Sequence, residues 1–156
     1  MEFTVINAAK RIMAPLVLLA LGACTTLETP TYADETGAIR GYDPVAYHLD
    51  QQPVRGDPAW SAQYRNATWY FASEQNRDLF RGNPGRYAPQ YGGYCAYAMS
   101  GGRVVPTDPN AWHIENGKLY LNYSQGIRNV WIRDVPGYVR NADRHWSEKK
   151  ASGDFE

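Results

Sequence analysis

The chain has 156 residues, with 16 basic and 16 acidic side chains, 12 tyrosines and five tryptophans. This length suits one domain built around a single core. Because the charges balance and form no basic face or run, the composition argues against a nucleic-acid-binding protein.

Residues 1–23 have the pattern of an export signal. Lys10 and Arg11 precede a short apolar run, IMAPLVLLALGA. This run is well below the ~20 residues that a transmembrane helix needs, so we interpret it as a signal peptide. It ends in LGAC, which resembles a bacterial lipobox, whose cysteine (here Cys24) is diacylated and becomes the new N-terminus. The alternative is an ordinary signal peptide followed by a cysteine that occurs there by chance.

Lipidation of Cys24 would make the membrane a partner of this protein, because several acyl chains form a firm anchor. Thr25 carries no inner-membrane retention signal, so in a two-membrane bacterium the expected location is the periplasmic face of the outer membrane. Residues 24–39 are polar, lack apolar periodicity and are interpreted as a tether. Removal of residues 1–23 takes away Glu2, Lys10 and Arg11 and leaves 14 basic and 15 acidic residues, a formal charge of −1.

One local pattern predicts three short helical turns. Each copy has an Asp or Asn that can cap a helix, a proline suited to the first helical position, and an aromatic residue one turn later. The copies are Asp43-Pro44-Val45-Ala46-Tyr47, Asn83-Pro84-Gly85-Arg86-Tyr87 and Asp108-Pro109-Asn110-Ala111-Trp112. Each turn is expected to hold a ring in the core. Leu, Ile and Val are sparse beyond the signal, so the core is expected to be largely aromatic.

Longer elements follow from other patterns. Residues 67–72, ATWYFA, predict a strand, and Ser73 can cap a helix that Gly82 ends. Residues 111–123 predict a β-hairpin, since Asn-Gly favours a type I′ turn between its alternating runs. Two C-terminal helices are predicted, each from apolar residues that share one helical face. The first has Ile127, Val130 and Trp131 on this face. The second begins at Asp134 and Pro136 and has Tyr138, Ala142 and Trp146 on its face. The predicted fold is α+β: a small single domain over residues 40–148 with a short antiparallel sheet, capped helical turns and C-terminal helices. A polar tail, 149–156, follows.

Three stretches carry a resemblance to a known family. GYDPVAYH, WYFASEQNRDLFRGNPGRYAPQYGGYCAYAMS and DPNAWHIENGKLYLNY resemble the exported branch of the YHS-domain family, over roughly residues 40–146. Metal-handling members of this family carry one cysteine after an Asp-Pro-Val and two in a Cys-Ser-x-x-Cys. The matching positions here are Ala46, Ala72 and Asn76. The resemblance therefore implies a metal-binding scaffold from which the usual thiolate ligands are missing.

Cys95 lies in YGGYCAYAMSGG and would be the one thiol left after lipidation of Cys24. It cannot form an intrachain disulfide, so in an oxidising compartment it is buried, bound to a ligand or reactive. The nearby glycine pairs allow another group to approach the backbone. Alternation of Tyr94, Ala96 and Ala98 with Cys95, Tyr97 and Met99 favours a strand. On a strand Met99 would lie ~13 Å from Cys95, so Met99 is expected in the core.

These observations favour a lipid-anchored binding module of the YHS type that holds a metal ion or a small ligand near Cys95. The predicted ligand contacts are Cys95, Tyr94, Tyr97 and His113. The predicted metal ligands are Cys95, His113 and His48, with copper or zinc as the ion. One alternative is a single-thiol redox enzyme that uses Cys95, and another is an envelope interaction protein in which Cys95 is structural. No catalytic motif was found, and no protein partner is indicated.

Overall fold

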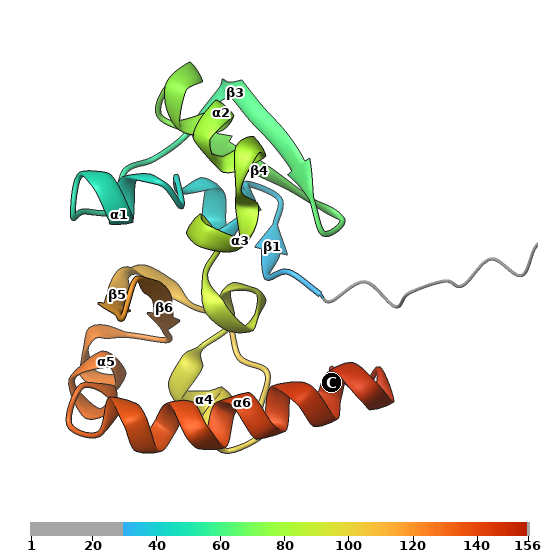
Figure 1. The fold of residues 1–156 in the computed structure, drawn as a ribbon, viewed down its shortest axis with the longest axis vertical. Helices are drawn as coiled ribbons and strands as arrows, with labels where there is room; N and C mark the ends of the chain where they lie inside the picture. Colours follow the sequence, from blue (N-terminus) through green and yellow to red (C-terminus); the bar gives the residue numbers. More distant parts are fainter. Residues whose placement is uncertain (1–29, 156) are drawn as a thin grey trace, which may run out of the picture.

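The computed structural model describes residues 30–155 (Figure 1). The expected signal peptide, the lipidation site Cys24 and tether residues 24–29 lie outside this range. The described part is an α+β domain with antiparallel two-stranded sheets, which confirms the predicted fold class. Within residues 30–155, no helix is both long and apolar enough to cross a membrane.

The strands pair as neighbours along the chain, β1 with β2, β3 with β4, and β5 with β6. Their bounds are β1 Ala33–Asp34, β2 Gly37–Ala38, β3 Asp57–Tyr64, β4 Ala67–Phe71, β5 Asp108–Glu115 and β6 Lys118–Asn122. The α-helices are α1 Ala46–Leu49, α2 Glu74–Gly82, α3 Pro84–Tyr87, α4 Ala96–Ser100, α5 Gln125–Trp131 and α6 Val135–Ser152. Two 3₁₀ segments are η1 Ile39–Gly41 and η2 Gln90–Gly93.

The first core lies between the β3–β4 hairpin and helices α1 to α3 (Figure 1). Alternate residues of β4 point inward, so Trp69 and Phe71 contact Phe80 of α2, with ring centroids 5.2 and 5.1 Å apart. The Ser73 hydroxyl accepts a hydrogen bond from the Asn76 N–H at 3.1 Å, which confirms the predicted cap of α2.

The second core lies between the β5–β6 hairpin and helices α4 to α6 (Figure 1). Asp134 caps α6 by accepting a hydrogen bond from the Gly137 N–H at 3.0 Å, as predicted. Trp131 of α5 stacks on Tyr138 of α6 at 5.6 Å. Both cores are rich in Tyr, Trp and Phe, so the expectation of an aromatic core is confirmed.

Strand β6 joins the two cores. Leu119 and Leu121 belong to the first core, whereas Tyr120 belongs to the second. The reason is the two-residue period of a strand, which sends successive side chains to opposite faces. Both faces of this strand are covered, so four of its five residues are buried.

Three local expectations differ from the structure. Asp108-Pro109 begins strand β5 and not a helical turn, because the Asp108 carboxylate accepts the Asn110 N–H at 2.9 Å within an extended segment. Residues 32–39, expected in the tether, form β1, β2 and the start of η1, with Tyr32 and Ile39 buried. The expected tail also belongs to the fold, since Phe155 contacts the ring of Trp146 at 5.4 Å.

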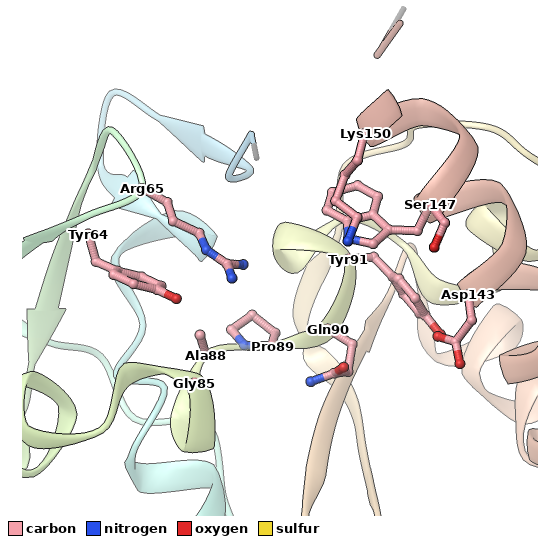
Figure 2. A pocket seen from close by; sticks show the side chains of 11 residues that line it. Tyr64, Arg65, Gly85, Ala88, Pro89, Gln90, Tyr91, Asp143, Ser147 and Lys150 are labelled. Atoms are coloured by element: carbon pink, nitrogen blue, oxygen red, sulfur yellow. The ribbon is translucent and has the colours of Figure 1, made fainter. Parts of the chain in front are cut away.

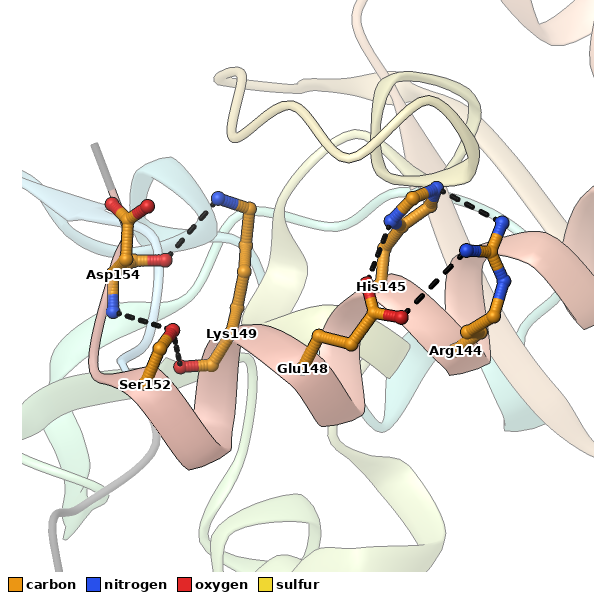
Figure 3. A network of polar contacts seen from close by, with 6 residues as sticks. All are labelled: Arg144, His145, Glu148, Lys149, Ser152 and Asp154. Carbon is orange, nitrogen blue, oxygen red and sulfur yellow. Dashed lines mark hydrogen bonds and ion pairs between the residues drawn. The ribbon is translucent and has the colours of Figure 1, made fainter.

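The end of α6 is held by local polar contacts (Figure 3). Glu148 pairs with Arg144 at 3.6 Å and with His145 at 3.2 Å. Lys149 donates to the Asp154 carbonyl at 3.2 Å, and Gly153 takes the left-handed conformation that ends the helix. Exposed pairs of this kind contribute only about 0–1 kcal/mol each. These polar contacts and the packing of Phe155 lie at the end of α6. The helix extends to Ser152, beyond the predicted end of the domain at residue 148.

Candidate functional site

Cys95 is the N-cap of helix α4 and is 1% exposed. The alternation that favoured a strand was misleading, because residues 96–100 form a helical turn. Gly92 and Gly93, with φ of 63° and 85°, reverse the chain just before it. The Cys95 N–H donates to the Val105 carbonyl at 2.9 Å. The backbone of Cys95 is therefore held by the turn before it and by this hydrogen bond to the segment that follows α4. Met99 is fully buried, as expected.

The sulfur of Cys95 makes the contacts of a structural cap. It accepts hydrogen bonds from the Ala98 N–H at 3.4 Å and the Tyr123 N–H at 3.3 Å. The thiol donates weakly to Asn122 Oδ1 at 3.9 Å. Burial raises the pKa of the Cys95 thiol above its ordinary value, although the backbone donors and Arg103 act in the opposite direction. The folded protein therefore keeps this sulfur as a neutral thiol near pH 7, which weakens it as a nucleophile.

A pocket of about 190 Å³ opens beside Cys95. Its lining comes from α4, α5 and the segments that flank them, namely Cys95, Tyr97, Ala98, Arg103, Val105, Tyr123 and Ile127. One thiol is the only soft donor in this lining, and the guanidinium of Arg103 would repel a cation. The pocket suits a small neutral or anionic group better than a metal ion.

Asn122, which sequence reasoning missed, lies behind the thiol and is fully buried. Its Oδ1 accepts the Tyr97 N–H at 3.2 Å as well as the thiol hydrogen, which fixes the orientation of the amide. Its Nδ2 has no hydrogen-bond partner among residues 30–155. A buried donor of this kind is costly unless water or a ligand satisfies it. No sequence motif marks Asn122, because it lies 27 residues from Cys95.

The structure brings Tyr97 to the Cys95 pocket but not the other predicted contacts. Tyr94 packs on Tyr32, with ring centroids 5.6 Å apart. His113 of β5 pairs with Glu115 at 3.2 Å and does not line the pocket. Within the described residues, no three His, Cys, Asp or Glu side chains are grouped to hold a metal ion.

His48 lies in α1, in contact with the first core, where its ring meets Tyr87 edge-on at 5.5 Å. It does not line the Cys95 pocket. Burial lowers the pKa of His48, and the charge of Arg86 acts in the same direction, whereas hydrogen bonding to the Tyr87 backbone acts in the opposite direction. Its Nε2 is buried and has no hydrogen-bond partner among residues 30–155. These features describe a neutral histidine held within the fold.

The three positions that the resemblance matches to the metal-binding cysteines of YHS domains converge on one carboxylate. Asp43 is fully buried, and its Oδ1 accepts the N–H groups of Val45 at 2.8 Å and Ala46 at 3.3 Å. Its Oδ2 accepts the Ala72 N–H at 2.8 Å and the Asn76 Nδ2 at 2.7 Å. Four hydrogen-bond donors therefore surround the Asp43 carboxylate. Among residues 30–155, no cationic side chain forms an ion pair with it. Asp43 ties α1, β4 and α2 together at this point.

A larger polar cleft of about 500 Å³ lies elsewhere, between the β3–β4 turn and helix α6 (Figure 2). Tyr64 and Arg65 form one wall, and Asp143 and Lys150 belong to the other. No sequence pattern indicates this cleft, because its lining comes from three segments that only the fold brings together.

Comparisons of the chain with models of protein families, with curated proteins and with solved structures gave no match. The resemblance to YHS domains therefore stays a prediction from the sequence.

Proposed function

We propose that the protein is a lipid-anchored binding module of the cell envelope with a YHS-type scaffold, which holds a small ligand in the pocket beside Cys95. The observation that carries this proposal is the buried Cys95 thiol in the pocket lining, with the Asn122 side chain behind it, whose Nδ2 has no hydrogen-bond partner among residues 30–155. With Arg103 in the lining, the pocket offers donors to a neutral or anionic group.

The YHS-type scaffold is supported by the contacts of Asp43. Ala46, Ala72 and Asn76 are far apart in the sequence, yet each donates a hydrogen bond to this one carboxylate. Positions that carry thiolates for one ion in metal-handling YHS domains must meet in space, and the three matching positions of this chain do. Because Ala46, Ala72 and Asn76 provide no thiol, we place the proposed ligand site elsewhere in the fold.

The competing redox function is less well supported. A redox thiol needs a lowered pKa and access to its substrate, whereas burial raises the pKa of Cys95 and leaves it 1% exposed. A metal function would need ligands besides Cys95, and neither His113 nor His48 lines the pocket.

Native mass spectrometry of protein purified without chelator from its own envelope tests the binding site. We expect a bound mass that disappears in Ile127→Trp, which fills the pocket, and in Cys95→Ala. Ile132→Trp is the matched control, because Ile132 is 42% exposed and does not line the pocket. Absence of any bound mass in the wild type, with wild-type stability in Ile127→Trp, would contradict the proposal. One copper or zinc ion per chain that Cys95→Ser loses would support the metal alternative instead.

The anchor is tested separately through Cys24. We expect Cys24→Ser to convert a membrane-associated protein into a soluble or unprocessed form without unfolding the domain. A wild-type protein that partitions entirely into the soluble periplasmic fraction would refute lipid anchoring while leaving the binding site untouched.

A further inference from the structure

The polar cleft has two walls and a floor. Figure 2 shows Tyr64 and Arg65 on one side and Asp143, Ser147 and Lys150 of α6 on the other, with Pro89 and Gln90 between them. The side chains of Arg65 and Lys150 point into the space between the walls. The ring of Trp146 also contributes to the lining.

The charge in this cleft is not balanced by the residues that the structure describes. Neither Arg65 nor Lys150 forms an ion pair within residues 30–155. The one carboxylate of the lining, Asp143, already accepts the Tyr91 hydroxyl at 2.9 Å. Two cations and one carboxylate leave a formal charge of +1, and two cations directed into one cleft favour an anion between them.

The backbone at Arg65 gives independent support. Arg65 and Asn66 form the two-residue β3–β4 turn with φ of 49° and 57°, a conformation that an arginine adopts at a cost. The corresponding turn of the other hairpin uses Asn116-Gly117, the residues that such a turn prefers. Residues in strained conformations cluster at functional sites, although core residues such as Ile39 share this conformation here. The Arg65 guanidinium also lies over the Tyr64 ring, 5.0 Å from its centroid.

We propose that this cleft binds a phosphorylated polyol or sugar. A phosphate monoester carries nearly two negative charges at neutral pH and matches the planar fork of Arg65 together with the point charge of Lys150. Gln90, Ser147 and Asp143 offer hydrogen bonds to hydroxyl groups, and the mostly buried Trp146 is the large apolar residue of the lining. The site is separate from the Cys95 pocket, since the two share no lining residue.

The place where the chain enters the fold suggests two sources for this group. The Tyr32 N–H donates to the Gly92 carbonyl at 2.8 Å, and a β-carbon on Gly92 would overlap the carbonyl oxygen of Pro30 and contact Trp146. The chain therefore enters beside a wall of the cleft. If Cys24 is lipidated, the cleft lies close to a membrane, so the phosphate can belong to a soluble polyol phosphate or to a lipid headgroup.

The test is an NMR titration of the full chain in nonionic detergent, with glycerol 3-phosphate as the probe. Glycerol and inorganic phosphate are the control compounds, and phosphatidic acid in the same micelles presents the same group as a headgroup. The indole N–H of Trp146 reports on the cleft, and that of Trp60, outside its lining, is the reference. We expect glycerol 3-phosphate to shift the Trp146 signal saturably and more tightly than either control compound. A response to phosphatidic acid alone assigns the site to a headgroup.

Variants separate binding from folding. Arg65→Gly relaxes the turn, so we expect an unchanged or higher Tm together with roughly tenfold or greater loss of affinity. Lys150→Gln should lose affinity similarly, whereas Arg133→Gln, an exposed cation outside the lining, should not. The proposal is overturned if neither glycerol 3-phosphate nor phosphatidic acid binds, or if Arg65→Gly and Lys150→Gln bind like the wild type. Equal affinity for inorganic phosphate and glycerol 3-phosphate overturns the polyol class.

Discussion

Replacement of Asp43 by asparagine should destabilise the protein severely, although it changes one oxygen to an amide nitrogen. Each carboxylate oxygen accepts hydrogen bonds from two donors, Val45 and Ala46 at Oδ1 and Ala72 and Asn76 at Oδ2. Whichever way the new amide is turned, its NH₂ group faces two donors, so two hydrogen bonds to a charged group are lost. At about 1.5–3 kcal/mol for each such bond, the expected loss is about 3–6 kcal/mol.

This loss is comparable with the whole free energy of unfolding of a small domain, about 5–15 kcal/mol. Urea denaturation followed by far-UV circular dichroism measures it directly. Asp57→Asn is the matched control, because Asp57 is exposed and accepts a single backbone hydrogen bond, from Ala59 at 2.8 Å. We expect that control to lose about 1 kcal/mol or less. If Asp43→Asn also stays within about 1 kcal/mol of the wild type, the four-donor reasoning is wrong.

The remaining predictions concern the missing thiols and two buried titratable groups. Combined replacement of Ala46, Ala72 and Asn76 by cysteine should create a tight zinc or Cu(I) site, measured by competition with a chromogenic chelator; stoichiometric binding by the natural protein with Cys95 blocked would reveal a site not recognised above. Burial raises the pKa of the Cys95 thiol in the folded protein. The contribution of the neutral thiol to the stability of the folded state is therefore complete below the unfolded pKa of about 8.5, and it is lost as the pH rises through the folded pKa. Stability should therefore fall less above this pH in Cys95→Ser, and alkylation of the native thiol should be slower than that of free cysteine; equal rates would contradict burial. Because the pKa of His48 is lowered, its contribution is complete above about pH 6.5 and is lost as the pH falls through the folded pKa. His48→Gln should flatten the decline of Tm between about pH 7 and 5, and an unchanged slope would place the titration elsewhere.

Local signals in the sequence determined the elements whose stabilising contacts lie within a few residues. Ser73 and Asp134 cap their helices through N–H groups three residues later, and the Asn116-Gly117 turn closes its hairpin with adjacent residues. Such contacts depend on spacing alone, so they can be predicted without knowledge of the rest of the fold.

The segment around Cys95 shows where local pattern fails. Alternation over six residues favoured a strand, but the sulfur caps a helical turn and also accepts an N–H from Tyr123, 28 residues away. A five-residue helix has too few turns to show a helical period. The conformation was decided by partners that the tertiary structure supplies.

The candidate sites were decided almost entirely by tertiary structure. The sequence identified Cys95 as a single thiol, and the family resemblance identified Ala46, Ala72 and Asn76 as a set. Only the fold placed Asn122 behind the thiol, Asp43 between the three positions, and Arg65 opposite Lys150. The geometry of a binding site depends on the distances between residues of separate segments. In this protein those distances follow from the packing of the two aromatic cores on opposite faces of β6.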